Sequence, residues 1–321
     1  MKSKPFPQAV LITGAAGFIG RHLLETLRCL QPEIRLVALD RRPIHPLPEV
    51  EAHCLELSPK NREALKKVIN GCGVEAVVHC AGSSFPHQED LKRDHVESAL
   101  GLLEVLASSK PGLIFCHIGS SAEYRPLPQP QKTREDTPTD PVGEYGRIKL
   151  AVTRTVLEYT RRGIIRGYVV RLFNPIGGGM PETQLVGRLC RLVQRRPTGP
   201  LTVGNLDTFR DYGDVRDMVR GIAVSLFQAD RLTGRVLNLG SGCARSTREL
   251  VAGFLRRLPW PVDLQESEKE DSRRSPAVYW QEADISLAQA LLGWSPRIPF
   301  SETLDDIARS IPFSFDEQSK T

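Results

Sequence analysis

A glycine-rich turn near the N-terminus constrains the fold of this chain more than any other feature. The apolar run AVLIT (9–13) leads directly into TGAAGFIG (13–20), and apolar residues then recur at helical spacing up to residue 30. Gly14, Gly17 and Gly20 permit a tight turn, a close approach of a pyrophosphate to backbone N–H groups, and close packing of helix on strand. The turn therefore predicts a dinucleotide-binding strand–turn–helix unit, with a glycine spacing one residue longer than the common fingerprint.

The rest of the chain alternates apolar strand patterns with helical ones. Strands are expected at 34–40, 76–82, 112–121 and 167–174, and helices at 60–70, 96–108 and 144–161. Continuous apolar strands that alternate with helices predict an α/β fold, a Rossmann-type doubly wound parallel sheet covered on both faces.

After residue 174 the alternation weakens, although a helix at 183–195 and a strand at 235–242 are still expected. We therefore predict a dinucleotide-binding domain over 1–175 and a smaller C-terminal α/β substrate lobe over 176–321. The strand near 235–240 is expected to return to the first sheet.

An acidic residue marks the cofactor. Asp40 ends the second expected strand, 20 residues after Gly20, where a carboxylate can accept hydrogen bonds from the adenosine ribose. Arg41 and Arg42 follow it, and an arginine at this place can pair with a 2′-phosphate. Because Asp40 would repel that phosphate, we expect NAD, with NADP as the alternative.

Two hydroxyl side chains follow the strand at 112–121. In GSSAEY (119–124), Ser120 and Ser121 are expected at the carboxyl edge of the sheet, where ligands of open α/β sheets bind. A helix cap or a serine turn is the structural alternative.

A tyrosine and a lysine four residues apart are the candidate acid–base pair. In DPVGEYGRIK (140–149), Asp140 suits a helix cap and Pro141 a first helical turn. Tyr145 and Lys149 then share one helix face, where the ammonium group favours a phenolate. Tyr145 could thus transfer a proton to or from a substrate oxygen.

Composition argues against several other classes of protein. The 40% hydrophobic and 25% charged fractions are typical of a soluble globular protein, and no apolar run approaches the roughly 20 residues of a membrane span. The N-terminus shows no secretory pattern, so a cytoplasmic location and no membrane partner are expected. The net charge of +5 is dispersed, which suits an anionic small substrate better than nucleic acid. Seven cysteines without a CxxC pair predict neither disulfides nor a zinc site, and no metal is expected.

The motifs together resemble the extended short-chain dehydrogenase/reductase family of the NAD-dependent epimerase/dehydratase type. TGAAGFIG, Asp40, HCAG (79–82), SSAEY (120–124), YGRIK (145–149) and RLFNPIG (171–177) occur in the family's order. The resemblance implies an NAD(P)-holding Rossmann-type domain, a lobe for a nucleotide sugar, and a homodimer paired through the helices at 96–108 and 144–161. Val96, Leu100, Leu103 and Val105 offer that interface more apolar surface than one sheet face needs.

The resemblance also assigns roles by position. Ser120 is the catalytic hydroxyl, with Ser121 as its substitute, Tyr145 transfers the proton, and Lys149 also binds the nicotinamide ribose. Beyond the three glycines and Asp40, it implies cofactor contacts from Phe18, Ile19, Arg41, Ala81 and Gly82. It implies substrate diphosphate contacts from Asn174, Arg210, and Arg273 or Arg274.

Within the family, several reactions are open. Dehydratases carry an Asp–Glu pair where this chain has Ser121 and Ala122, so a 4,6-dehydratase is not expected. Segments 203–223 and 291–304 are most similar to GDP-6-deoxy-D-mannose (rhamnose) reductases, which implies reduction of a 4-keto-6-deoxy nucleotide sugar of the GDP-4-dehydro-6-deoxy-mannose type. A nucleotide-sugar epimerase with tightly bound NAD is the alternative. A non-catalytic NAD(P)-binding sensor or scaffold would be favoured by loss of Tyr145 or Lys149, and both are present.

Three positions depart from the family pattern. His95 stands where the family has Asn near the cofactor, Gly178 replaces a usual proline, and Gly213 replaces a bulkier residue. These departures bear on the substrate more than on the hydride chemistry.

Overall fold

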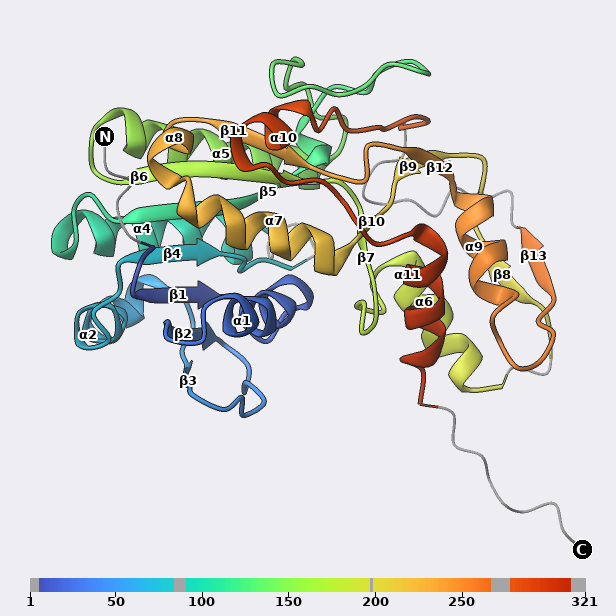
Figure 1. Ribbon diagram of the computed structural model, residues 1–321, viewed down its shortest axis with the longest axis horizontal. Coiled ribbons are helices and arrows are strands. Elements are labelled where there is room, and N and C mark those ends of the chain that lie inside the picture. The colour runs from blue at the N-terminus through green and yellow to red at the C-terminus, as the bar shows by residue number, and fades with distance from the viewer. Residues whose placement is uncertain (1–5, 84–90, 197–198, 267–277, 313–321) are drawn as a thin grey trace, which may run out of the picture.

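A seven-stranded parallel sheet forms the centre of the larger lobe. The computed structural model describes residues 6–83, 91–196, 199–266 and 278–312. The strands follow the order β3–β2–β1–β4–β5–β6–β11 (Figure 1). Their bounds are β1 (Ala9–Thr13), β2 (Arg35–Asp40), β3 (Val50–Cys54), β4 (Ala76–His79), β5 (Ile114–Ser120), β6 (Arg166–Leu172) and β11 (Val236–Leu239). The order reverses between β1 and β4, which is the place where open α/β sheets bind ligands.

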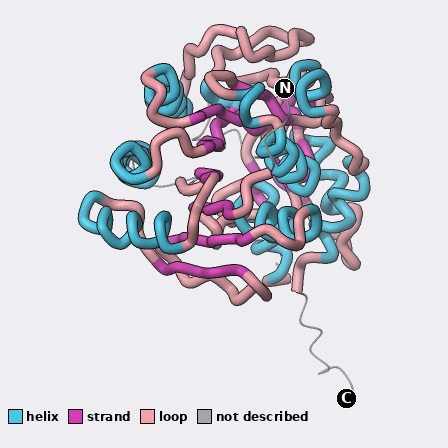
Figure 2. Tube along the Cα trace, turned by 60° about the vertical axis from the view of Figure 1, so that its left-hand side comes forward, coloured by secondary structure: helices cyan, strands magenta, loops and turns pink. Residues whose placement is uncertain are grey.

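Helices cover both faces of this sheet (Figure 2). One face packs on α1 (Phe18–Leu30), α7 (Val215–Phe227), α8 (Ala229–Leu232) and α10 (Ser286–Leu292). The other packs on α2 (Arg62–Gly71), α4 (Ser98–Ser109) and α5 (Glu144–Arg161). The expected doubly wound architecture is therefore confirmed.

The smaller lobe stands at the carboxyl ends of the strands (Figure 1). It contains α6 (Leu185–Gln194), β8 (Leu201–Val203), β9 (Phe209–Asp211), β12 (Ala244–Ser246), α9 (Thr247–Leu255), β13 (Leu264–Glu266) and α11 (Phe300–Arg309), around an apolar core of its own. Strands β7 (Pro175–Ile176) and β10 (Gly213–Asp214) pair where the chain passes between the lobes. The strand expected near 235–240 is β11, and it pairs with β6. The domain boundary at residue 175 stays a prediction.

Three local expectations were wrong. Strand β3 was missed, so GSSAEY follows the fifth strand rather than the fourth. Helix α5 begins at Glu144 with Gly143 as its N-cap, so Asp140 does not cap it and Pro141 lies outside it. The regular helix α4 begins at Ser98, after a π-helical turn η2 (Lys92–Glu97).

The apolar residues proposed for a dimer interface are largely used within one chain. Leu103 and Val105 are buried in the core beneath α4, and only Val96 and Leu100 are half-buried. The homodimer thus stays a prediction that rests on the family resemblance. None of the helices in the described part of the chain has the length and apolar character needed to cross a bilayer.

Candidate active site

A single cleft of about 1130 Å³ runs along the carboxyl edge of the sheet and under the smaller lobe. Every described residue that the sequence predicted for catalysis or binding lines it: Gly14, Gly17, Phe18, Ile19, Gly20, Asp40, Arg41, Ala81, Gly82, Ser120, Ser121, Tyr145, Lys149, Asn174 and Arg210. Arg273 and Arg274 lie outside the described residues. Segments far apart in sequence therefore converge on one site, and their individual roles stay predictions.

The glycine-rich turn has the geometry that a pyrophosphate needs. Gly14 has a φ of +69°, and a Cβ on it would come within 2.7 Å of the Ala81 backbone. Helix α1 starts at Phe18 with Gly17 as its N-cap, so no capping side chain covers its first N–H groups. The first residues of α1 line the cleft, and the N–H groups at a helix N-terminus suit the phosphates of a dinucleotide.

Asp40 and the two arginines that follow it line the end of the cleft where an adenosine is expected. Asp40 is 6% exposed, and its carboxylate accepts hydrogen bonds from the N–H groups of Ala16 (3.0 Å) and Arg42 (2.9 Å). Arg41 donates two hydrogen bonds to the buried Asp94, at 2.7 and 3.0 Å. Burial raises the pKa of Asp94, but hydrogen bonds and charge from Arg41 outweigh it and lower that pKa. The Arg41 fork is thus already paired with a carboxylate, which favours a ribose over a 2′-phosphate at Asp40.

The two serines differ in their surroundings. The Ser120 side chain accepts a hydrogen bond from the N–H of Ala122 at 3.2 Å and caps the short helix η3 (Ser121–Glu123), so the structural alternative is realised alongside its place in the cleft. Ser121 is buried and donates its hydroxyl to Oε1 of Gln281 at 3.0 Å. Ser120 is therefore the better-placed hydroxyl for a substrate oxygen.

Tyr145 and Lys149 lie in the first turns of α5, facing the cleft. Lys149 is 5% exposed, and its ammonium donates to the carbonyl of Ile118 on β5. Tyr145 is half-buried, with its ring edge-on to that of His95 at a centroid distance of 5.8 Å. Between them, Gly146 lets α5 approach η3 closely, because a Cβ there would meet Ala122 and come 2.7 Å from Cβ of Pro141. The same packing brings Ser120 and Tyr145 to one cleft.

The His95 ring lies next to Gly82 and Ser83, shortly after the end of β4. Its Nε2 lies 2.9 Å from the carbonyl of Ser83, and any side chain at Gly82 would run into its ring. The departure from the family's Asn thus places an imidazole ring between Gly82 and Tyr145.

Two buried histidines lie on neighbouring strands of the sheet, near Lys149. His79 on β4 and His117 on β5 are register partners, with ring centroids 5.6 Å apart. Burial, together with the charge of Lys149, lowers the pKa of His79 to about 3 and that of His117 well below its usual value. Both imidazoles are therefore neutral at physiological pH and add no second positive charge next to Lys149.

A buried ion pair supports the serine segment and was not predicted. Glu123 accepts hydrogen bonds from the Ser120 N–H and from Nε of Arg171, each at 2.8 Å. Both side chains are almost fully buried. An arginine inside the apolar strand GYVVRLFN was the available signal, because a buried charge requires a partner.

At the end of the cleft where the substrate is expected, a residue from the smaller lobe joins the site. Oε1 of Gln281 accepts hydrogen bonds from Ser121 and from Nδ2 of Asn174, each at 3.0 Å. Arg210 lines the same end, where its guanidinium donates to the carbonyls of Phe209 and Val278 at 2.9 and 2.7 Å. Gln281 was missed because a lone glutamine in an irregular stretch carries no sequence signal.

Comparison with known proteins adds a family and several relatives. Residues 10–240 match the sequence model of the NAD dependent epimerase/dehydratase family. The chain is 31% identical to the dTDP-6-deoxy-L-talose 4-dehydrogenase (NAD(P)(+)) of Kitasatospora kifunensis, over 94% of this chain and 95% of that one. It is 29% identical to the UDP-glucose 4-epimerase of Azospirillum brasilense, over 94% and 90% of the two chains. The solved structure of MoeE5 in complex with UDP-glucuronic acid and NAD has a TM-score of 0.82 at 27% identity, and the match covers 94% of this chain and 98% of that one.

Proposed function

The chain belongs to the NAD dependent epimerase/dehydratase family and is an NAD-dependent nucleotide-sugar enzyme, and we propose that it reduces a 4-keto-6-deoxy nucleotide sugar with NAD(P)H. The observation that carries this proposal is the convergence of Ser120, Tyr145 and Lys149 in a cleft that also contains the glycine turn and Asp40. Similarity along the whole chain to a 6-deoxy-sugar 4-dehydrogenase supports position 4 and the 6-deoxy sugar.

The residues of the chain fit the cofactor. The first N–H groups of α1 are available for its pyrophosphate, and the Asp40 carboxylate for its adenosine ribose. When bound, the cofactor supplies or accepts the hydride. Lys149, fixed at the Ile118 carbonyl, would hold the nicotinamide ribose and keep a positive charge next to Tyr145.

Proton transfer at the sugar oxygen is assigned to Tyr145. Its hydroxyl would donate a proton to the C4 oxygen in reduction and accept one in oxidation, with Ser120 hydrogen-bonded to the same oxygen. Water removal has no support among the described residues, because Ala122 offers no acid or base and Glu123 is buried against Arg171. This argues for a simple reduction and against a 4,6-dehydratase.

The nucleotide is proposed to carry a pyrimidine base. The guanosine nucleotide suggested by the sequence has no support among the relatives described above, which are named for dTDP and UDP sugars. Asn174 and Arg210 are proposed to contact its diphosphate. A panel of GDP, dTDP and UDP sugars, screened by thermal stabilisation with NAD(H) present, tests this assignment because a ligand that binds only the native state raises its melting temperature.

A second candidate, nucleotide-sugar 4-epimerase, is favoured by the similarity to UDP-glucose 4-epimerases. The two reactions differ in their need for reductant. An epimerase interconverts its sugars with NAD that stays bound, whereas a reductase consumes one added NAD(P)H per turnover. Turnover of a stabilising UDP or dTDP sugar without added reductant would favour the epimerase.

The Tyr145→Phe variant tests the catalytic assignment. It removes the proton and leaves the helix and the cofactor site unchanged, so kcat should fall by a factor of about 10² to 10⁴. NAD affinity, measured by fluorescence titration, should be nearly unchanged. Tyr159→Phe on the same helix is the matched control, since Tyr159 packs on the core side of α5 and should keep full turnover. Near-normal turnover of Tyr145→Phe would contradict the assignment.

A further inference from the structure

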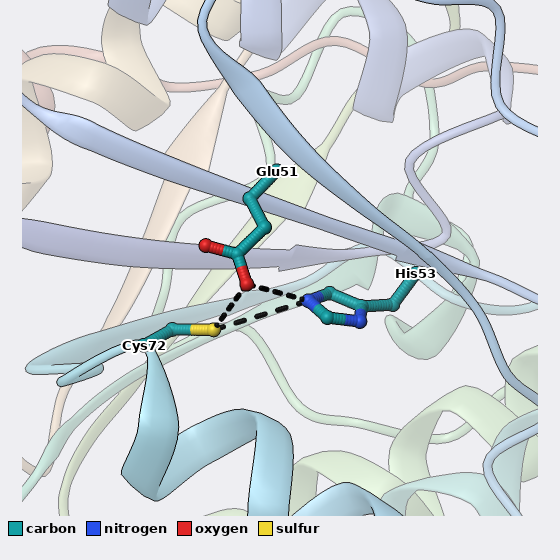
Figure 3. A group of neighbouring side chains, drawn as sticks. All are labelled: Glu51, His53 and Cys72. Carbon is teal, nitrogen blue, oxygen red and sulfur yellow. Dashed lines mark hydrogen bonds and ion pairs between the residues drawn. The ribbon is translucent and has the colours of Figure 1, made fainter.

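Three side chains capable of binding a metal converge outside the cleft (Figure 3). Glu51 and His53 project from the same face of the edge strand β3, two residues apart, and Cys72 is the C-cap of α2. Oε1 of Glu51 lies 3.0 Å from Sγ of Cys72 and 3.1 Å from Nε2 of His53, and Sγ lies 3.8 Å from Nε2. None of the three lines the catalytic cleft.

The separations of these donor atoms suit one small cation. Tetrahedral Zn²⁺ with bonds of about 2.0–2.3 Å keeps its donor atoms roughly 3.4–3.6 Å apart. The three separations of 3.0, 3.1 and 3.8 Å depart from that spacing by no more than about 0.6 Å. Small rotations of the partly exposed Glu51 and His53 side chains close this difference.

Charge and hydrogen bonding prepare the carboxylate as a ligand. Arg35 donates to Oε2 at 2.7 Å, which fixes the carboxylate and leaves Oε1 directed at Cys72 and His53. Such an outer partner orients a metal ligand, and the positive charge of Arg35 limits the affinity.

We propose that Glu51, His53 and Cys72 form a binding site for a divalent transition metal of the Zn²⁺ class, with its fourth position open to solvent. A thiolate, an imidazole and a carboxylate select Zn²⁺, and Co²⁺ as its spectroscopic substitute, over Mg²⁺ or Ca²⁺. Because a thiol binds a metal as its thiolate, the metal displaces the Cys72 proton when it binds.

Such an ion would stabilise one edge of the cofactor cleft. It would join β3 to the C-terminus of α2, the two ends of segment 55–71, and Leu55, Glu56 and Leu57 of that segment line the cleft. The absence of a CxxC motif led the sequence analysis to expect no metal. The site escapes that rule because the fold, rather than close spacing in the sequence, brings Cys72 at the end of α2 next to Glu51 and His53 on β3.

Cobalt binding to the full chain, expressed without a histidine tag, tests the proposal. Titration with Co²⁺ alone should give one equivalent with the visible bands of a tetrahedral ion and a near-ultraviolet thiolate-to-cobalt charge-transfer band. Zn²⁺ should abolish both spectra by displacement, and Mg²⁺ should not. Cys72→Ser should remove the charge-transfer band, and His53→Gln should weaken Co²⁺ binding by about 10-fold or more, since even outer-shell partners contribute about 10- to 100-fold.

Matched controls separate this site from other thiols and histidines. Cys54→Ser removes an exposed thiol next to His53 in sequence, and His45→Gln an exposed imidazole, so both should bind Co²⁺ as the wild type does. Folding of each variant is checked by its melting temperature and NAD binding. If Cys72→Ser fails to fold, the partly exposed His53→Gln decides the outcome. A wild type without the charge-transfer band, or a band that Cys72→Ser and His53→Gln both retain, overturns the proposal.

Discussion

Replacing Glu123 by glutamine should destabilise the protein far more than its small change in shape suggests. Glu123 is 0% exposed, and its two oxygens accept from two different donors, the Ser120 N–H and Nε of Arg171. A glutamine has one acceptor oxygen and one donor nitrogen. One of the two donors would therefore face an NH₂ group, and Arg171 would keep its charge in the core with no carboxylate.

The structure gives the magnitude of this effect. Breaking a buried ion pair by removing one partner costs about 3–5 kcal/mol, because the remaining charge stays desolvated. Arg171 also lies over the Tyr124 ring at 4.2 Å, and this contact offsets a part of that cost. We expect a loss of about 3 kcal/mol in the free energy of unfolding, a large share of the roughly 5–15 kcal/mol of a typical protein.

Urea unfolding followed by circular dichroism measures the loss in free energy of unfolding. The slope of this free energy against urea concentration should be the same as in the wild type, which checks that both proteins unfold in the same way. Glu158→Gln is the matched control, since Glu158 forms an exposed pair with Arg161 that solvent screens, so its loss should hardly change the free energy of unfolding. The double variant Glu123→Gln/Arg171→Met removes the uncompensated charge and should recover part of the stability. Two results would refute this reasoning. In the first, Glu123→Gln lowers the free energy of unfolding by less than about 1 kcal/mol. In the second, the double variant is no more stable than Glu123→Gln.

The remaining predictions concern pH and assembly. The pKa of His79 is lowered to about 3 from 6.5, so between these values the unfolded chain binds more protons and the free energy of unfolding rises with pH. We expect His79 to lower the free energy of unfolding by about 1.4 kcal/mol for each pH unit below pH 6.5, and His117 acts in the same direction. When the free energy of unfolding is measured by urea titration at several pH values between 5 and 7, His79→Gln should make it depend less steeply on pH. The family resemblance predicts a homodimer through α4 and α5, and light scattering that finds only monomer at micromolar concentration would count against it.

The parts that sequence predicted well are those in which one short segment carries all the constraints. The turn at Gly14 needs a positive φ and close contact with the Ala81 backbone, and only glycine satisfies both. The buried strands appear as continuous apolar runs because helices cover both faces of the sheet. Strand β3 lacks that pattern because it lies at the edge of the sheet, where the polar residues Glu51 and His53 are half-exposed.

The start of α5 shows where a local rule fails. Asp140 and Pro141 form a favourable cap and first turn by sequence, yet the helix begins at Glu144, the start of the expected range 144–161, and Gly143 is its N-cap. A Cβ on Gly146 would run into Ala122 of η3 and the Pro141 side chain, so Pro141 packs against the first turn of α5 instead of forming it. This tertiary contact has no signal in the local capping pattern.

The substrate end of the cleft could not be predicted, because its contacts join residues more than 100 positions apart. Gln281 meets Ser121 across 160 residues and Asn174 across 107, and no local pattern encodes either contact. The larger lobe contributes the glycine-rich turn after β1, and Tyr145 and Lys149 on α5, whereas Gln281 comes from the smaller lobe. If Tyr145, Lys149 and Gln281 have the roles proposed above, a change in the smaller lobe should alter which sugar is bound while the hydride chemistry is kept. The contacts of Gln281 are therefore the place where we expect sugar selectivity to be set.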